Sequence, residues 1–319
     1  MLHRFANPDE QIRGHEPRSL SRSLEYLRRK RYALVGMGDL VNRLERGTPL
    51  DRDTVAFTVD DGYADFAAVA SPIFAAYDCP VTVFLVTDFV AGRIWNWYDR
   101  VEWCFEESAR TAVQLDLLDG SFTARWANKA ERLAVGSEFV EGLKRVPDGV
   151  KEDRILALAD ALDVGIPAQV PIRYRAMGWE DVRACGKRGA TFGPHTLTHP
   201  ILSRVDDLRA ATEIQESWKA VSDATESTVP VFCYPNGTAA DFSARDQGLV
   251  AQAGMRAAVS AIEGSIASTP SRLTQVNPYS LPRYPYSENR HRFVQIASGV
   301  EQLKTRVRRG LTRGAGNQH

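Results

Sequence analysis

Two kinds of apolar pattern alternate along the chain. Short continuous runs of β-branched and aromatic residues, typical of strands buried on both faces, are separated by amphipathic segments with helical spacing. In the first part of the chain this pattern predicts strands at 32–35, 54–58 and 81–86, and helices at 19–31, 39–47 and 63–77. Later it predicts strands at 190–192, 229–234 and 257–259, and helices at 179–187, 206–225 and 244–253. Such alternation is typical of an α/β fold with a mainly parallel sheet, either open or closed into a barrel.

Residues from about 93 to 175 interrupt this alternation. Val113 to Leu117 alternates with period two, Asp119-Gly120 is a turn signal, and Ser121 to Arg125 returns, which predicts a hairpin. Helical patterns follow at 126–145 and 151–162. Because the strand and helix alternation then resumes, we interpret 93–175 as a mostly helical insertion within a single domain of residues 1–290.

The last segment, 291–319, is a basic helix or tail. It mixes apolar residues such as Leu303 and Leu311 with several arginines, which is typical of a helix that contacts an anionic membrane. A packed terminal helix is the alternative, and the pattern leaves both open.

Composition narrows the function classes. The 319 residues include 40 basic and 40 acidic side chains, so no overall field favours nucleic acid. The beginning of the sequence lacks the long apolar core of a signal peptide, and we expect a cytoplasmic protein. The four cysteines form no CxxC pair, which predicts reduced and mostly buried thiols.

Two groups of residues that carry chemistry follow predicted strands. Asp60 and Asp61 end the strand at 54–58, and His195 and His199 follow the strand at 190–192. A solvated turn and a pair of surface or capping histidines would explain each group alone. Together they form a His-His-Asp donor set that leaves a position open for water, as in a catalytic zinc-type site, with the second acid free to take a proton.

The chain here resembles the polysaccharide deacetylases, the NodB-homology enzymes of carbohydrate esterase family 4. Thr58-Val59-Asp60-Asp61-Gly62 resembles their TFDDG motif, and His195-Thr196-Leu197-Thr198-His199 resembles their H(S/T)xxH motif, in the same order. Leu2-His3-Arg4-Phe5 and the stretch 179–183 are also similar to bacterial members. The resemblance covers about 54–92 and 175–285.

This resemblance implies a distorted (β/α) barrel of the NodB type carrying the helical insertion. It also implies that Asp61, His195 and His199 bind one divalent metal ion and that Asp60 is the general base. Zinc is the expected ion, and cobalt, nickel or manganese are alternatives because a His-His-Asp set accepts several metals.

Two family motifs are altered. The RxPY motif falls on Cys233-Tyr234-Pro235-Asn236, where the backbone N–H of Asn236 would bind the oxyanion. Cys233 replaces the arginine that pairs with the base in the family, so we expect something else to orient Asp60. The LxH motif falls on Leu281-Pro282-Arg283, which has no histidine to act as the general acid.

Several residues are candidates for the general-acid role of the missing LxH histidine. Arg283 is too basic to donate a proton readily, but it could stabilise developing charge. Asp60, once protonated, could return its proton to the leaving amine, and His291 is an acid candidate if the alignment shifts. Asp241 and Asp246 lie near the expected acidic motif, and ordinary surface acids would explain them as well.

The predicted activity is hydrolysis of N-acetyl groups from an N-acetylated sugar in a polysaccharide or a glycan precursor, by activated water attack on the amide. Tyr234 and Trp95 are candidate substrate contacts; Trp95, with Trp97 and Tyr98, could form a stacking platform or the core of the insertion. One alternative function is hydrolysis of another small amide or ureide. Another is a carbohydrate-binding pseudoenzyme with degenerate motifs.

Overall fold

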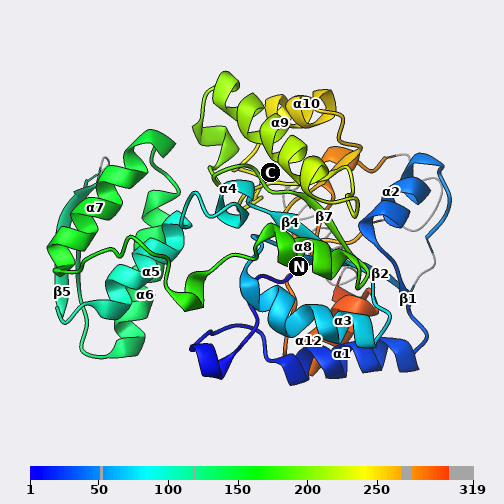
Figure 1. Ribbon diagram of the computed structural model, residues 1–319, viewed down its shortest axis with the longest axis horizontal. Helices are drawn as coiled ribbons and strands as arrows, with labels where there is room; N and C mark the ends of the chain where they lie inside the picture. The colour runs from blue at the N-terminus through cyan, green and yellow to red at the C-terminus, as the bar shows by residue number, and fades with distance from the viewer. Residues whose placement is uncertain (51–52, 118–119, 267–274, 302–319) are drawn as a thin grey trace, which may run out of the picture.

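Parallel strands form the centre of the computed structural model, which describes residues 1–50, 53–117, 120–266 and 275–301 (Figure 1). One sheet contains β3 (Phe57–Val59), β4 (Val81–Leu85) and β7 (Ala190–Pro194), in that order. Two parallel pairs accompany it: β1 (Ala33–Leu34) with β2 (Thr54–Val55), and β8 (Val231–Cys233) with β9 (Ala257–Val259).

Single parallel bridges join these strands into a distorted barrel. Phe192 of β7 pairs with Thr228, just before β8, and Val259 of β9 pairs with Leu281. At the other edge Leu2 pairs with Val59 of β3, and the N–H of Tyr286 donates to the carbonyl of Met1 at 2.9 Å. The first residues of the chain therefore lie between β3 and the segment that follows Leu281, and the expected barrel architecture is confirmed.

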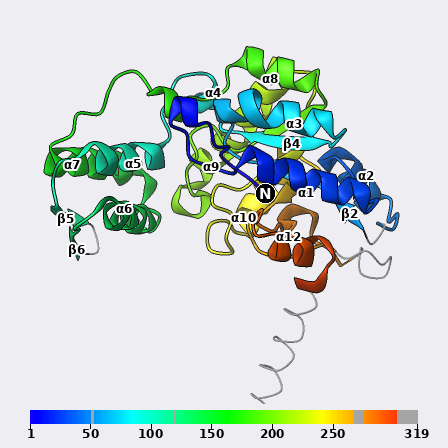
Figure 2. The same ribbon diagram turned by 90° about the horizontal axis from the view of Figure 1, so that it is seen from below.

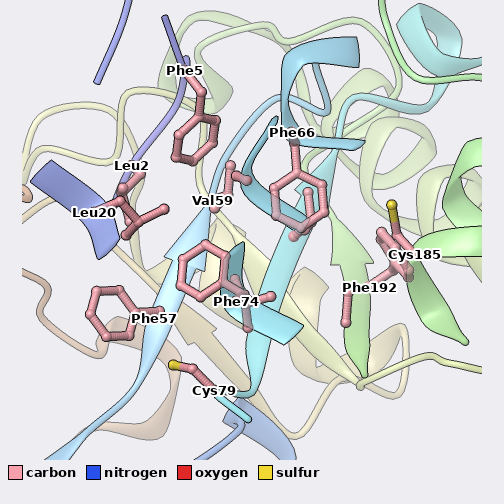
Figure 3. Packing of buried hydrophobic residues seen from close by; sticks show 14 of the residues in the cluster. Leu2, Phe5, Leu20, Phe57, Val59, Phe66, Phe74, Cys79, Cys185 and Phe192 are labelled. Atoms are coloured by element: carbon pink, nitrogen blue, oxygen red, sulfur yellow. The ribbon is translucent and has the colours of Figure 1, made fainter. Parts of the chain in front are cut away.

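Helices surround these strands (Figures 1 and 2). They are α1 (Pro17–Arg29), α2 (Met37–Glu45), α3 (Ser71–Ala76), α4 (Thr87–Val90), α8 (Trp179–Gly186), α9 (Asp207–Ala224), α10 (Ala244–Gln252) and α12 (Arg290–Ala297). The largest apolar cluster lies between the β3–β4–β7 sheet and α1, α3 and α8 (Figure 3). The helix predicted at 63–77 consists of a π-helical stretch, η2 (Phe66–Ala70), followed by α3, whose first turn contains Pro72. Proline is tolerated there because the first N–H groups of a helix have no internal partner.

The insertion forms a lobe beside the barrel with an apolar cluster of its own (Figure 1). It contains α5 (Trp97–Glu107), the antiparallel hairpin of β5 (Ala112–Leu117) and β6 (Gly120–Arg125), α6 (Lys129–Leu143) and α7 (Lys151–Leu162). Phe105, Phe139 and Leu158 are fully buried within it. Burial of this cluster accounts for the helical periodicity that the sequence shows in this region.

Part of the basic C-terminal segment belongs to α12, but residues 302–319 lie outside the described residues. Membrane contact through that tail therefore stays a prediction. Across the described ranges, none of the helices combines the length and the apolar character needed to cross a bilayer.

Candidate active site

The candidate residues meet at the carboxyl ends of the barrel strands. Asp60 and Asp61 directly follow β3, His195 follows β7, and Asn236 lies three residues beyond β8. Arg283 follows Leu281, the residue bridged to β9. The carboxyl end of a parallel barrel is the face on which loops assemble active sites, and the sequence motifs converge there as expected.

Asp61, His195 and His199 point their ligand atoms at one another. Asp61 Oδ1 lies 3.6 Å from His195 Nε2 and 3.6 Å from His199 Nε2. Zinc–nitrogen bonds of about 2.0–2.1 Å in a tetrahedral arrangement place neighbouring ligand atoms roughly 3.4 Å apart, so one ion fits among these three atoms. His195 Nδ1 lies 2.7 Å from the carbonyl oxygen of Cys233. Because a carbonyl only accepts, Nδ1 carries the hydrogen and the lone pair of Nε2 faces Asp61.

Burial shapes the protonation of this donor set. All three side chains are buried, and burial lowers the pKa of both histidines, which keeps them in the neutral form that binds metal. Burial and the adjacent charge of Asp60 raise the pKa of Asp61 to about 7. A divalent cation would compensate for two neighbouring buried carboxylates, so the electrostatics of the site fit the expected ion.

A second donor group, Asp60, His195 and Cys233, is less suited to a metal. Both oxygens of Asp60 already accept hydrogen bonds from Arg283, which also donates to Cys233 Sγ at 3.2 Å. The guanidinium thus places a positive charge against this group. Of the two groups, the predicted set of Asp61, His195 and His199 is therefore the better suited to a metal ion.

Glu213 of α9 holds the histidine loop, and the sequence analysis did not single it out. Its Oε2 accepts from the backbone N–H groups of Leu197 and Thr198, each at 2.9 Å, and its Oε1 accepts from the Thr198 hydroxyl. Its side chain is buried, and burial raises its pKa. In sequence it looks like an ordinary acid of an amphipathic helix, so no local signal separates it from its neighbours.

Left-handed backbone conformations gather at the site. Asp61, Thr196, His199 and Asn236 all have positive φ, from 55° to 77°. Non-glycine residues adopt this region at a cost, and such residues cluster at functional sites. Gly62 has a φ of 92°, and a Cβ there would lie 2.9 Å from Leu85 Cδ2, which explains the glycine after the acid pair.

Arg283 is the partner of Asp60. Its Nη1 and Nη2 donate to Oδ1 and Oδ2 of Asp60 at 2.7 and 2.8 Å, a bidentate pair between buried side chains. Burial by itself would raise the pKa of Asp60, but the charge and hydrogen bonds of Arg283 outweigh it and hold the pKa below its usual value. An arginine from the segment after β9 thus replaces the one that Cys233 displaced at the end of β8.

The contacts of Arg283 differ from the expected charge-stabilising role. Nε donates to the carbonyl of Ser260 and Nη1 also donates to Thr58 Oγ1, both at 2.9 Å. With the two bonds to Asp60 and the one to Cys233, all five of its N–H donors are engaged. None is left for a substrate oxygen, so Arg283 is placed to orient Asp60 and not to contact developing charge.

A cavity of about 1140 Å³ lies above these residues. Asp60, Asp61, His195, His199 and Asn236 line it on the barrel side, and α5 and α6 of the insertion contribute the opposite wall. No group in the described part of the chain accepts a hydrogen bond from the backbone N–H of Asn236. This N–H is therefore available for an oxyanion, as the sequence predicts.

The aromatic candidates separate into two groups. Trp97 and Tyr98 line the cavity, and the Tyr98 ring lies 5.3 Å from that of His199. Trp95 is not among the cavity residues; its ring packs against Trp103 and Tyr174. Tyr234 lines the cavity but is buried, stacks on Phe242 at 4.0 Å and donates its hydroxyl to the carbonyl of Tyr279.

The remaining acid candidates have structural contacts. Asp246 is buried and caps α10 through Ser243, and Asp241 accepts from Thr238 in the preceding turn. His291 is exposed at the first turn of α12 and is not among the residues that line the cavity. A different histidine lies beside Asp60: His3 Nε2 is 3.8 Å from Asp60 Oδ2.

Comparison with known proteins agrees with this geometry. Residues 140–258, which include the histidine loop but not the acid pair, match the family model described as polysaccharide deacetylase. No curated protein is significantly similar to the chain in sequence.

Solved structures resemble the whole molecule. The Streptococcus pyogenes deacetylase PplD is 16% identical, with a TM-score of 0.56 over 90% of each chain. IcaB from Ammonifex degensii is 13% identical, with a TM-score of 0.54 over 93% of each chain. The de-N-acetylase from Aggregatibacter actinomycetemcomitans is 13% identical, with a TM-score of 0.53 over 90% of this chain and 94% of that one. Residues 140–258 thus match the polysaccharide deacetylase model, and the chain shares its fold with these solved deacetylases.

Proposed function

We propose that this protein is a metal-dependent hydrolase that removes N-acetyl groups from an N-acetylated sugar of a polysaccharide or glycan precursor. The observation that carries the proposal is the convergence of Asp61, His195 and His199 beside Asp60, which Arg283 holds in its ionised form. The match of residues 140–258 to the polysaccharide deacetylase model supports deacetylation of glycans.

Asp61, His195 and His199 would hold the ion. The chemistry that a divalent cation supplies there is polarisation of the amide carbonyl and a lowered pKa of a water molecule. The neutral histidines and the fixed tautomer of His195 favour this binding.

Asp60 accepts the proton of the attacking water. Its carboxylate is held by both amino groups of Arg283 and lines the cavity, so it faces the space that the substrate enters. The backbone N–H of Asn236 donates to the oxygen of the tetrahedral adduct, where a fixed donor lowers the barrier. Hydrolysis is complete when the C–N bond breaks and the leaving nitrogen takes up the proton that Asp60 received from water, which yields acetate and a free amine.

The size of the cavity favours part of a chain over a single sugar. Small-molecule pockets usually have volumes of about 300–1,000 Å³, and this cavity exceeds that range. Trp97 and Tyr98 lie on its wall and offer apolar faces to sugar rings.

The pseudoenzyme alternative is based on two altered motifs, one without the arginine that pairs with the base and one without the LxH histidine. Arg283 supplies that partner from another segment, and a protein that only binds sugar has no use for an ionised carboxylate clamped beside a metal site. The bidentate pair thus favours the hydrolase. Hydrolysis of another small amide or ureide stays an outcome of the test.

The test is acetate release by the metal-loaded protein from a panel of N-acetylated oligosaccharides, with simple amides and cyclic ureides as alternative substrates. We expect acetate from at least one N-acetylated glycan. His199→Ala should lose this activity together with its bound metal, measured by elemental analysis, because one of three ligands is gone. His291→Ala, which removes an exposed histidine, is the matched control and should keep both. Release from ureides alone, or full metal content in His199→Ala, would contradict the proposal.

A further inference from the structure

We propose that Asp148 is a positioning residue that holds the cavity wall of Trp97 and Tyr98 against the histidine loop, so that glycan binding and metal binding depend on one contact. The inference rests on the proposed deacetylation and adds to it a residue from outside the barrel. It starts from one juxtaposition: the carboxylate of Asp148 lies 2.9 Å from Lys151 Nζ and 2.9 Å from Arg209 Nη2.

Asp148 lies where the insertion meets the barrel. It begins η3 (Asp148–Val150), the short turn before α7, and its side chain is 14% exposed. Its Oδ1 accepts from Lys151 within the insertion, whereas its Oδ2 pairs with Arg209 in the first turn of the barrel helix α9. One carboxylate therefore ties the insertion to the helix that holds the histidine loop.

On the barrel side, the contacts continue to the metal ligand His199. Arg209 Nη2 donates to Thr198 Oγ1 at 3.4 Å and lies 3.7 Å from Glu213 Oε1. Glu213 in turn accepts from the N–H and the hydroxyl of Thr198, the residue before His199. Arg209 therefore joins Asp148 to the loop that presents His199.

On the insertion side, a line of aromatic contacts leads to the same ligand. The ammonium of Lys151 lies 4.7 Å from the centre of the Trp97 ring, a cation–π contact. The rings of Trp97 and Tyr98 are 5.5 Å apart, and the Tyr98 ring lies 5.3 Å from that of His199. Trp97 and Tyr98 also line the cavity. Contacts from Asp148 thus reach His199 both through the barrel and through the wall that faces the sugar.

The charges at this junction require an acid. The side chain of Lys151 is only 5% exposed, and a buried ammonium is costly unless an opposite charge pairs with it. Lys151 and Arg209 contact the same carboxylate, so without that carboxylate two positive charges face each other across the junction. Neutralisation of Asp148 therefore loosens the insertion from the histidine loop.

A second tie between the insertion and the barrel lies elsewhere. Arg13, in the N-terminal segment, pairs with Glu102 and Glu106 of α5. Within the described ranges, Arg13 forms neither a hydrogen bond nor an ion pair with residues 195–199. Arg13 thus fastens the insertion without touching the histidine loop, which separates its role from that of Asp148.

The first measurement is the zinc affinity of the apo protein, by titration with Zn²⁺ against a competing chelator. We expect Asp148→Asn, which keeps the shape but loses the charge, to bind zinc about 10-fold more weakly, as when residues that orient metal ligands are lost. Arg209→Gln breaks the same bridge and should cause a similar loss. The double variant should be no weaker than the weaker single variant, because both changes remove one contact.

Two control variants accompany the titration. Arg13→Gln breaks the other tie between insertion and barrel, and Asp163→Asn neutralises an aspartate of the insertion that is 80% exposed. Both should bind zinc as the wild type does. If Asp148→Asn does not fold, Arg209→Gln carries the test, because the Arg209 side chain is 45% exposed and its loss leaves Lys151 paired with Asp148.

The second measurement is acetate release from an N-acetylated oligosaccharide at saturating zinc, where weaker metal binding no longer limits activity. We expect KM in Asp148→Asn to rise about 10-fold while kcat falls less than about 3-fold, because the sugar-binding wall shifts and the loaded site keeps its reacting groups. Asp163→Asn should leave both constants unchanged. A residue that only stabilised the fold would lower the unfolding temperature and leave zinc affinity and KM unchanged.

Three results would overturn the inference. Wild-type zinc affinity in Asp148→Asn, or an equal loss in Arg13→Gln, would show that Asp148 does not position the histidine loop. Losses that multiply in the double variant would show that Asp148 and Arg209 act separately. An unchanged KM at saturating zinc would show that the wall does not depend on Asp148. If the wild type binds zinc but releases acetate from no N-acetylated glycan, the proposed function fails, and the titration still decides whether Asp148 positions the loop.

Discussion

Asp60 is an ionised carboxylate that is almost entirely removed from water. Taking such a group out of water is costly unless its charge is compensated in place. Arg283 does this with two short hydrogen bonds in a fork geometry that lysine cannot reproduce. At the scale of single residues, the chemistry of the site therefore depends on a pair whose members are 223 positions apart.

Arg283→Ala should impair both stability and activity. It leaves a buried carboxylate without its partner, which typically costs about 3–5 kcal/mol in unfolding free energy, and it leaves the base without orientation. Urea unfolding and the kcat for acetate release would both report the loss. Arg256→Ala, which removes an arginine from an exposed pair with Glu45, is the matched control and should cost only about 0–1 kcal/mol. Comparable losses in both variants would contradict a special role for Arg283.

The same variant should change the dependence on pH. Because Arg283 lowers the pKa of Asp60, the pair contributes its stability above about pH 4, where the carboxyl of an unfolded chain ionises. That contribution is lost only as the pH falls further. Without Arg283, burial raises the pKa of Asp60, so the acid limb of kcat/KM should move to higher pH. An unshifted limb in Arg283→Ala would show that Asp60 is not the base.

At the scale of elements, the histidine loop depends on a helix that contributes no ligand. The residues between His195 and His199 turn tightly, with Thr196 and His199 in left-handed conformations. Their N–H groups cannot pair within a strand or helix, and Glu213 of α9 accepts two of them. The position of α9 against the end of β7 thus determines where the two imidazoles meet.

Glu213→Ala should weaken metal binding by about 10–100-fold, the range seen when residues that orient metal ligands are lost. It should also lower the unfolding free energy by about 1–3 kcal/mol, because it leaves buried N–H groups unsatisfied. Glu213→Gln can accept the same two N–H groups through its amide oxygen and should keep most of the affinity. Titration of the apo protein with Zn²⁺, with the exposed Glu216→Ala on the same helix as control, makes the comparison. Unchanged affinity in Glu213→Ala would limit Glu213 to a role in stability.

At the scale of the whole molecule, two segments complete the site from outside the central sheet. The first residues of the chain close the barrel between β3 and the segment after Leu281, and they bring His3 to the base. The insertion between β4 and β7 folds around its own core and provides the far wall of the cavity. The barrel strands position the reactive groups, and the N-terminal residues and the insertion form the walls around those groups.

The sequence predicts the parts of this site that depend on local spacing. Asp60-Asp61 and the pair His195 and His199 each follow a predicted strand. Because the carboxyl ends of parallel strands lie at one edge of a sheet, the sequence indicates directly that these groups meet. Arg283 and Glu213 act through contacts between distant segments. Their roles depend on which strand ends and loops lie side by side, and no local pattern encodes that. The cysteine at position 233, where the family has an arginine, indicates only that some other residue must pair with Asp60.

The central claim is that Asp60 is the general base of a metal-dependent deacetylation. Acetate release and bound metal measured together in Asp60→Asn test it most directly, because asparagine keeps the shape of the side chain but cannot take the proton. The account predicts full metal content and a loss of about 10²–10⁴-fold in kcat on the glycan that the wild type deacetylates. Asp60→Asn that binds metal and still releases acetate at the wild-type rate would contradict it.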